Sequence, residues 1–298
     1  MTSPVLAGSW VALVTPFRNG SIDRDALFRL LDLHIAAKTD GLVICGTTGE
    51  SVTLSTAEKA DLMENVTKRI NGRIPLMLGT GSNNTASTVE STRNAADLGA
   101  EAVLVVTPYY NKPPQNGLIA HFREVAAATE LPVVLYNVPG RTGVNLLPGS
   151  VLELARTPGT NIKAIKEASG NIEQAMDILR AAPPGFSLLS GEDALNLPLM
   201  MVGATGTISV TGNVDPRRMK IFNDAARAAQ WNEARSLHFE LLDLHRAMFL
   251  EANPIPVKAA LNMMGLIGDE YRLPLIPATS STREKLAVIL GKMGLTKN

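Results

Sequence analysis

The stretch Asn161-Ile-Lys-Ala-Ile-Lys-Glu-Ala-Ser-Gly170 predicts a short β-strand that ends in a turn. Successive side chains of a strand point to opposite faces, so Lys166 shares a face with Ala164, whereas Lys163 lies on the other face. A lysine held in a cavity loses its charge more easily, because desolvation lowers its pKa. The neutral amine attacks ketones and forms a Schiff base. The strand alone leaves two interpretations open: one reactive lysine, or two solvated lysines at the end of a strand.

Seven further apolar stretches share the character of this strand, and each ends in glycine or polar residues. They are residues 10–15, 42–46, 75–79, 102–107, 132–137, 186–190 and 205–210. Continuous apolar runs of this length are typical of parallel strands that are buried on both faces. The chain therefore offers eight candidate strands.

Helical patterns separate these strands. Residues 23–38 and 55–70 carry apolar side chains at helical spacing behind Asp23 and Ser55, which are good N-cap residues. Further patterns of this kind cover residues 85–98, 117–129, 171–181 and 192–201. The alternation of strands and helices predicts a closed α/β fold, the (β/α)8 TIM barrel. An open, doubly wound sheet is the alternative, but no strand is followed by a G-x-G-x-x-G turn.

The strands stop after about residue 215, and only helical patterns follow. These patterns cover residues 217–229, 231–250, 256–264 and 282–293. We predict a catalytic barrel of residues 1–229 and a C-terminal helical domain of residues 230–298. An apolar stripe in this part consists of Leu237, Leu241, Leu244 and Met248. Such a stripe favours core or subunit packing over cofactor binding.

Composition narrows the possible partners. The 298 residues include 28 basic and 28 acidic side chains, so the zero formal charge favours neither nucleic acid nor membranes as a partner. The single cysteine, Cys45, excludes an internal disulfide, and the four histidines lack the close pairing of a metal site. The sequence shows no signal-peptide pattern and no apolar run of about 18 residues. We expect a soluble, cytoplasmic protein whose partners are small molecules and copies of itself.

Polar clusters follow several of the predicted strands, where a barrel places its active site. In Gly46-Thr-Thr-Gly-Glu50, backbone N–H groups and two hydroxyls can bind a carboxylate. Residues 107–113 and 136–143 contain three of the four tyrosines, and a phenol can transfer a proton. Arg141 offers a planar pair of donors for a carboxylate, although a surface ion pair is an equally simple interpretation.

Taken together, these segments resemble the dihydrodipicolinate synthase branch of the family that also contains N-acetylneuraminate lyase. The resemblance covers nearly the whole chain and is carried by the order and spacing of short motifs. They are G-T-T-G-E at 46–50, V-T-P-Y-Y-N-K-P at 106–113, Y-N-V-P-G-R-T at 136–142, I-K-E-A-S-G at 165–170, S-G-E-D at 190–193, G-T-I-S-V-T at 206–211 and N-P-I-P-V-K at 253–258.

The resemblance implies a Schiff-base enzyme. It selects Lys166, rather than Lys163, as the lysine that condenses with pyruvate. It implies that Tyr136 transfers protons beside the imine and relays them through Thr47 and Tyr110. The second substrate would be L-aspartate semialdehyde and the product 4-hydroxy-tetrahydrodipicolinate, an intermediate of lysine and diaminopimelate biosynthesis. The resemblance implies neither a metal nor an organic cofactor.

The resemblance also implies substrate-binding residues. Thr47 and Thr48 would hold the pyruvate carboxylate, and Arg141 would hold the carboxylate of the aldehyde substrate. Gly191 and Ile208 would line the pocket through their backbones.

A homotetramer made of two tight dimers is a further implication of the resemblance, because the residue corresponding to Tyr110 comes from the neighbouring subunit in this family. In members inhibited by lysine, the inhibitor binds at the tight-dimer interface. Ser51, Asn83 and Tyr109 match the positions of that site. Thr56 and Lys59 replace histidines, however, and Ser87 replaces an acidic residue. We therefore expect weak or absent inhibition by L-lysine.

Two alternatives remain at this point. A lyase or aldolase acting on a sugar acid would share Lys166, Tyr136 and the G-x-x-G-E loop, but the P-G-R-T sequence around Arg141 favours the synthase. A barrel without catalytic activity could instead bind a keto acid or a protein partner. Trapping of pyruvate by borohydride distinguishes an enzyme from a binding protein.

Overall fold

The computed structural model describes residues 4–296. Eight parallel strands close into a barrel in the order β1-β10-β9-β8-β7-β6-β5-β4, so each barrel strand lies beside the next barrel strand of the chain, and the last, β10, lies beside the first, β1. The strands are β1 (Gly8–Ala12), β4 (Gly41–Ile44), β5 (Leu76–Gly79), β6 (Ala102–Val106), β7 (Val133–Asn137), β8 (Ile162–Glu167), β9 (Ser187–Ser190) and β10 (Gly206–Ser209). The predicted TIM barrel is confirmed, and the closed order excludes the open sheet.

The described chain divides into two compact units. The first contains the described residues up to Gly8 and Pro75–Ile208, and the second contains Ser9–Ile74 and the described residues from Ser209 onward. The predicted division into a barrel of residues 1–229 and a helical domain of residues 230–298 stays a prediction, and its residues 1–3 and 297–298 lie outside the described part.

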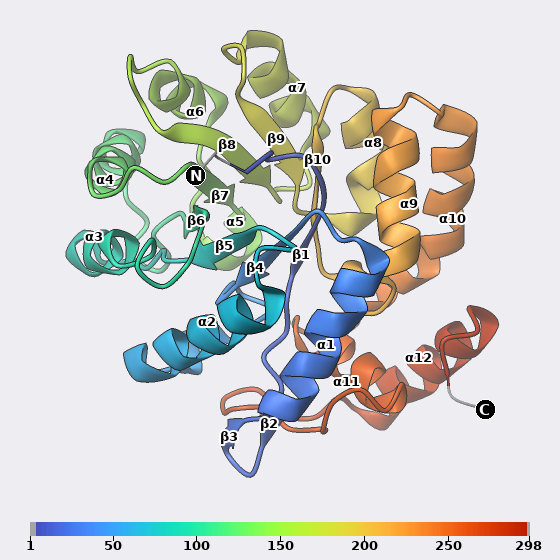
Figure 1. The fold of residues 1–298 in the computed structure, drawn as a ribbon. Coiled ribbons are helices and arrows are strands. Elements are labelled where there is room, and N and C mark those ends of the chain that lie inside the picture. The colour runs from blue at the N-terminus through green and yellow to red at the C-terminus, as the bar shows by residue number, and fades with distance from the viewer. Residues whose placement is uncertain (1–3, 297–298) are drawn as a thin grey trace. The chain divides into compact units, whose positions relative to one another are not determined.

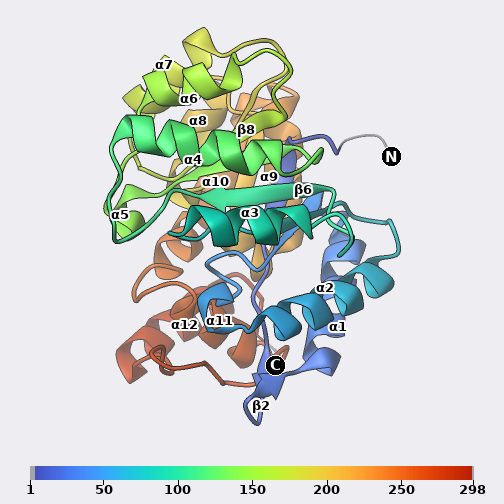
Figure 2. The ribbon, with the colours of Figure 1, turned by 90° about the vertical axis from the view of Figure 1, so that its left-hand side faces the viewer.

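The first unit contains six strands and the helices that connect them. These helices are α3 (Thr85–Arg93), α4 (Gln115–Ala127), α5 (Pro139–Thr142), α6 (Pro148–Ala155), α7 (Ile172–Ala181) and α8 (Asn196–Met201), with the short 3-10 helix η2 (Asp193–Leu195). Helices α3 and α4 lie side by side (Figure 2), and α6 packs against both α4 and α7 (Figure 1). Strand β7 is buried along its whole length, as expected for a strand covered on both faces.

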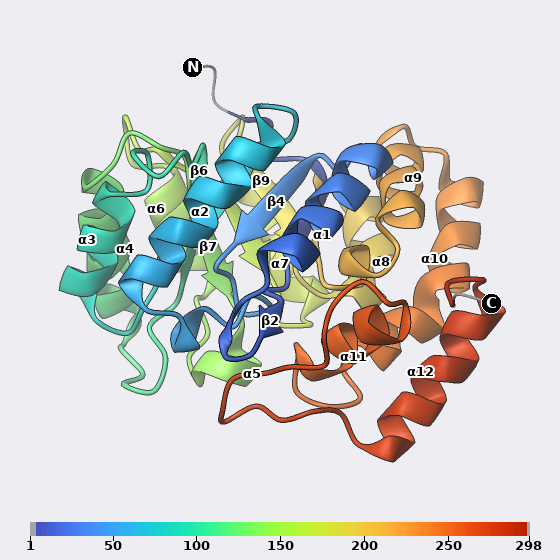
Figure 3. The ribbon, with the colours of Figure 1, turned by 60° about the horizontal axis from the view of Figure 1, so that its bottom comes forward.

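The second unit contains β4 and all of β1 except Gly8. Its other elements are β2 (Phe17–Arg18), β3 (Ser21–Ile22), α1 (Arg24–Ala37), α2 (Thr56–Ile70), α9 (Pro216–Arg227), α10 (Trp231–Ala247), α11 (Ile255–Met263) and α12 (Ser280–Lys292), with the 3-10 helices η1 (Ser51–Thr53) and η3 (Thr211–Asn213). The predicted helices of the C-terminal part are confirmed. Helix α10 lies beside α9, and α11 packs against α12 (Figure 3).

Local sequence explains how several of these elements begin. The predicted caps are confirmed: Asp23 accepts from Ala26 N, and Ser55 forms a reciprocal capping box with Glu58. In the barrel wall, Trp10 is paired with Gly41, and a Cβ at Gly41 would come 2.2 Å from the Trp10 indole. Glycine at this position therefore lets the indole lie flat against the neighbouring strand.

The apolar stripe on α10 packs inward as predicted. Leu241, Leu244 and Met248 are fully buried, and Leu237 is half-buried. Within residues 4–296, no helix combines the length and the apolar character that a membrane span requires.

Candidate active site

Lys166 and Tyr136 lie opposite each other on neighbouring strands near the carboxyl ends of β8 and β7. They are register partners, and Lys166 Nζ lies 4.4 Å from the centre of the Tyr136 ring. Lys166 is 5% exposed and Tyr136 is 6% exposed. The amine and the phenol are therefore held together in a place that is largely protected from water.

Burial separates the two lysines of the strand. Lys163 is exposed, and its Nζ donates to the Thr160 carbonyl at 2.6 Å. Only Lys166 lies in the barrel wall with its side chain covered. The resemblance selects Lys166 rather than Lys163, and of these two lysines only Lys166 is buried; its role as the reactive lysine stays a prediction.

Gly191 provides space for the Lys166 side chain. A Cβ at this position would come 2.8 Å from Cε of Lys166 and 2.7 Å from Cβ of Ala168. Gly191 N also donates to the Glu167 carbonyl at 2.8 Å, which ties the loop after β9 to β8. Ile208 is fully buried in β10. Of the predicted site residues, Lys166, Tyr136 and Gly191 are thus brought together directly.

Glu192 adds a carboxyl group close enough to Lys166 to interact with it electrostatically. Burial raises the pKa of Glu192, the neighbouring Asp193 raises it further, and Lys166 lowers it. In the sequence, Glu192 stands out only as part of the S-G-E-D motif. Two adjacent acids directly after a strand were the signal that could have singled it out.

A buried hydrogen-bond network lies beside Tyr136 and Lys166 and was not predicted from the sequence. Asn137 and Glu167, which follow Tyr136 and Lys166, are also register partners, and Asn137 Nδ2 donates to Glu167 Oε2 at 3.1 Å. Gln174 Nε2 donates to the same oxygen at 3.1 Å. The carboxylate thus connects β7, β8 and α7 next to the reactive side chains.

Asn145 completes this network from the loop before α6. Its side chain accepts from Asn137 Nδ2 at 2.7 Å and donates to Gln174 Oε1 at 2.8 Å. The backbone N–H of Ser169 donates to the other oxygen of Glu167 at 2.6 Å. The strand ends that carry Tyr136 and Lys166 are therefore fixed relative to each other.

The tyrosine loop after β6 is held by contacts with the segment around α5. Tyr110 N donates to the Thr142 carbonyl at 3.3 Å, and Thr107 Oγ1 donates to Thr142 Oγ1 at 3.2 Å. The Tyr110 side chain is 88% exposed, and its φ of 74° lies in the left-handed region that only a few non-glycine residues adopt. Arg141, on α5, is also exposed. Both predicted residues thus lie on surface segments of the first unit.

In the second unit, the predicted carboxylate loop, residues 46–50, is tightly packed. Thr47 is half-buried and Thr48 is buried, and Asn253 Nδ2 donates to Thr48 Oγ1 at 3.0 Å. Lys258 Nζ donates to Glu50 Oε1 at 2.5 Å, and both side chains are fully buried. The loop is therefore anchored by residues of the C-terminal segment.

The family of the chain follows from its sequence as a whole. Residues 5–293 match the model of the Dihydrodipicolinate synthetase family. The chain belongs to the dihydrodipicolinate synthetase family. The 4-hydroxy-tetrahydrodipicolinate synthase of Pelobacter propionicus is 48% identical over 288 residues, which cover 97% of this chain and 99% of that protein.

Solved structures of this family have the same fold. Dihydrodipicolinate synthase from Aquifex aeolicus has a TM-score of 0.96 and 43% identity, covering 98% of this chain and 100% of that chain. The chloride-inhibited enzyme from Acinetobacter baumannii, complexed with pyruvate, has a TM-score of 0.94 and 43% identity, covering 97% and 99%. A monomeric dihydrodipicolinate synthase variant has a TM-score of 0.96 and 40% identity, covering 98% of both chains.

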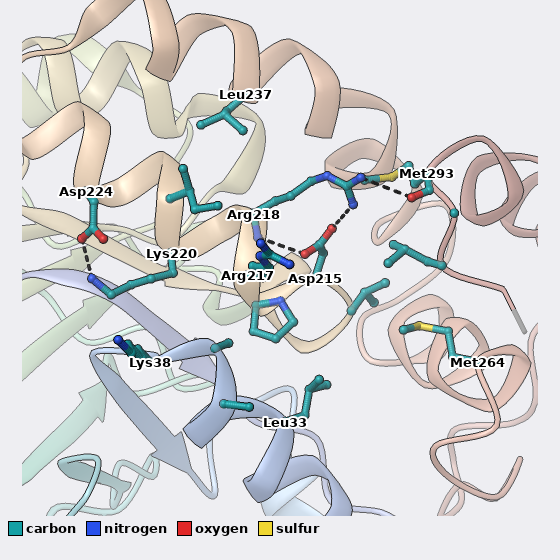
Figure 4. A pocket seen from close by; sticks show the side chains of 17 residues that line it. Leu33, Lys38, Asp215, Arg217, Arg218, Lys220, Asp224, Leu237, Met264 and Met293 are labelled. Atoms are coloured by element: carbon teal, nitrogen blue, oxygen red, sulfur yellow. Dashed lines mark hydrogen bonds and ion pairs between the residues drawn. The ribbon is translucent and has the colours of Figure 1, made fainter.

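The second unit also contains a large cavity. It has a volume of about 1110 Å³ and lies beside α1 and α9. Four of its charged side chains form ion pairs, Arg218 with Asp215 and Lys220 with Asp224, each at 2.5 Å (Figure 4). The residues that line it include none of the predicted site residues.

Within residues 4–296, no three His, Cys, Asp or Glu side chains are grouped so that they could hold a metal ion.

Proposed function

We propose that this enzyme condenses pyruvate with L-aspartate semialdehyde to give 4-hydroxy-tetrahydrodipicolinate, in lysine and diaminopimelate biosynthesis. The observation that carries the proposal is the buried amine of Lys166 held 4.4 Å from the centre of the Tyr136 ring. The identity of 48% to a protein named 4-hydroxy-tetrahydrodipicolinate synthase, and the similarity to a pyruvate complex, support the choice of reaction and first substrate.

In this proposal, Lys166 is the nucleophile. Its neutral amine adds to the ketone of pyruvate, and loss of water leaves a protonated imine. Loss of a proton from the methyl group then gives an enamine, because the imine nitrogen accepts the electron pair. Tyr136 transfers the protons, with Thr47 and Tyr110 as relay partners. Burial of Lys166 supports this role, since it keeps water away from the imine.

The enamine carbon attacks the aldehyde carbon of the second substrate, and the aldehyde oxygen takes up a proton. The amine of that substrate then displaces Lys166 from the imine, which closes the ring and frees the enzyme. Arg141 binds the carboxylate of the aldehyde substrate, and its exposed position suits a group that meets the second substrate on arrival. Each step conserves electrons without an external oxidant or reductant.

The remaining predicted residues shape the binding of pyruvate in this proposal. Thr47 and Thr48 donate to its carboxylate, and burial of Thr48 supports a defined position for that hydroxyl. Gly191 and Ile208 line the pocket. The close approach of Gly191 to Lys166 supports its role, because any larger residue would displace the lysine.

Borohydride trapping and a coupled assay test this function. Intact mass measurement after reduction should show one pyruvate adduct per chain, and peptide mapping should place it on Lys166. The purified enzyme should then consume L-aspartate semialdehyde in the presence of pyruvate. Adduct formation without that activity, together with cleavage of a sugar acid, would instead favour the lyase.

We propose further that the protein forms a homotetramer of two tight dimers in which Tyr110 serves the neighbouring subunit. The 88% exposure of this tyrosine supports the assignment, because a catalytic phenol needs a protein environment that its own chain does not supply. A monomeric variant among similar structures makes a direct measurement necessary. A cytoplasmic location stays a prediction.

Complementation between two inactive variants tests the shared site. A mixture of Lys166→Ala and Tyr110→Phe chains contains mixed dimers in which one site has both intact residues. After subunit exchange, activity should recover to roughly a quarter of the wild-type value. Sedimentation should show a tetramer in the same buffer. A fully active monomer, or the absence of recovery in mixed dimers, would contradict the proposal.

A further inference from the structure

The motif Asn253-Pro-Ile-Pro-Val-Lys258 has no part in the chemistry proposed above, yet both of its polar ends contact the 46–50 loop. Asn253 lies just before α11, and Lys258 lies within that helix. The Asn253 amide donates to Thr48 Oγ1 at 3.0 Å, and the Lys258 ammonium donates to Glu50 Oε1 at 2.5 Å. One short segment of the C-terminal part therefore binds the loop at two places.

The ion pair is buried to a degree that is unusual for two charged groups. Both side chains are 0% exposed, and the rings of Phe17 and Tyr271 lie 4.5 Å and 4.8 Å from Lys258 Nζ. Removing two charges from water is costly, and apolar residues of similar size often stabilise a fold equally well. Stability alone therefore does not account for the pair. A buried pair between Glu50 and Lys258 holds the 46–50 loop in a defined position relative to α11.

The loop needs such support because part of its backbone is strained. Glu50 has a φ of 52°, in the left-handed region, and its N–H donates to the Thr47 carbonyl at 3.1 Å. The second carboxylate oxygen of Glu50 accepts from Arg272 N at 3.1 Å. Both oxygens of Glu50 are thus held, and the backbone that connects Glu50 to Thr47 and Thr48 is held with them.

We propose that Asn253 and Lys258 are positioning residues that orient Thr47 and Thr48 toward the carboxylate of pyruvate. The inference rests on the proposed function, in which these two threonines bind that carboxylate. The Asn253 amide occupies a lone pair of the Thr48 hydroxyl, so the hydroxyl hydrogen is directed to another acceptor. Lys258 acts through Glu50 on the backbone of the loop. Through these contacts, the C-terminal segment determines how strongly the loop binds the carboxylate of the substrate.

A comparison of pyruvate with its uncharged methyl ester tests the proposal. The concentration of each compound that gives half-maximal borohydride trapping is measured for the wild type and for the paired variant Glu50→Gln/Lys258→Met. The paired variant removes both charges, so neither is left alone in the buried site. Its preference for pyruvate over the ester should fall by about tenfold or more, as expected for the loss of one charge-assisted hydrogen bond.

A second variant keeps the test decisive if the paired variant does not fold. Asn253→Ala removes the hydrogen bond to Thr48 Oγ1, and it should lower the same preference by about three- to tenfold. Lys285→Met, at an exposed position of α12, is the matched control and should leave the preference unchanged. Folding of each variant is checked by thermal melting.

An unchanged preference in either folded variant would overturn the proposal, and so would equal losses for acid and ester, which indicate a general collapse of the site. A wild-type protein that gives no adduct at Lys166 would contradict the proposed function instead. The two failures are therefore distinguishable.

Discussion

Lys166 and Lys163 lie in the same strand, and their different surroundings predict different reactivity. Replacement of Lys166 by alanine should abolish the borohydride-trapped pyruvate adduct, because the buried amine beside Tyr136 is lost. Replacement of the exposed Lys163, whose amine contacts the Thr160 carbonyl, should leave adduct formation intact. Intact mass after reduction measures both. An adduct that survives the loss of Lys166 would exclude it as the nucleophile.

Gly191 should be intolerant even of one methyl group. In Gly191→Ala, the new Cβ would lie 2.8 Å from Cε of Lys166, so the lysine side chain must move. A displacement of this size should slow formation of the pyruvate adduct by about tenfold to hundredfold. Quenched-flow trapping measures the rate. Gly149→Ala is the control, because nothing lies within 4 Å of the added atom there. Equal rates for both variants would show that the lysine adapts.

The Glu167 carboxylate should contribute to the stability of the fold. Glu167→Gln replaces one acceptor oxygen by an amide donor, so Asn137, Gln174 and the backbone N–H of Ser169 can no longer all find an acceptor there. A buried donor left without its acceptor should lower the free energy of unfolding by about 1–3 kcal/mol. Urea unfolding measures the change. Glu153→Gln, which removes a half-exposed ion pair with Arg123, should change it by less than about 1 kcal/mol. Similar losses in both variants would contradict the role of the network.

Helices and strands were predicted correctly where the pattern that indicates them lies within a short stretch of sequence. All eight barrel strands and the C-terminal helices follow from continuous apolar runs and helical spacing. Helix α6 was not predicted, because it has only eight residues and begins with Pro148 and Gly149, which are typical of turns. Pro148 is nevertheless well placed at the first helical position, where its missing N–H is not needed.

The contacts between elements were harder to predict. The pairing of Asn145 with Gln174 joins residues 29 positions apart, and neither residue has a local pattern that reveals its partner. Lys166, Tyr136 and Gly191 were found because short motifs surround them. The network beside them consists of the Glu167 carboxylate and three side-chain amides, whose contacts depend on the register of β7 and β8. Residue type and spacing therefore predict candidate reactive groups but do not predict the groups that hold them.

Helix α1 contains a histidine that should make stability depend on pH. His34 is fully buried beside Thr39, and burial lowers its pKa from 6.5 to about 3. Below pH 6.5 the unfolded chain binds a proton at His34 that the folded chain does not bind, so stability falls as pH decreases. The expected loss reaches about 1.4 kcal/mol per pH unit below the unfolded pKa and continues until the folded pKa is reached.

Urea unfolding of the wild type and of His34→Asn at two pH values checks this expectation. The free energy of unfolding should fall more steeply for the wild type than for the variant between about pH 6.5 and about pH 4.5. Asparagine keeps a polar group near Thr39 but does not titrate in this range. Parallel pH profiles for the two proteins would show that His34 does not control acid stability.

At the scale of the whole molecule, we expect little feedback inhibition by L-lysine. The resemblance implies an acidic residue in the inhibited members at the position of Ser87, and its absence would remove a charge-assisted hydrogen bond worth about 1.5–3 kcal/mol, or roughly tenfold to hundredfold in affinity. Lys59 and Thr56 replace the histidines of the inhibited members. A steady-state titration with L-lysine at fixed substrate concentrations measures the effect. Strong inhibition in the submillimolar range would overturn this expectation.

The ion pair between Glu50 and Lys258 joins residues that are 208 positions apart, so the ribosome adds the two partners to the chain at different times. A ribosome that adds about 5–20 residues per second makes Lys258 roughly 10–40 s after Glu50. Throughout that interval, the nascent chain carries a glutamate without the ammonium that holds it in the finished protein. Lys166 is already present in the chain while the 46–50 loop still lacks its anchor. Under the proposed role of the loop in binding pyruvate, substrate recognition is thus one of the last properties that a newly made chain acquires.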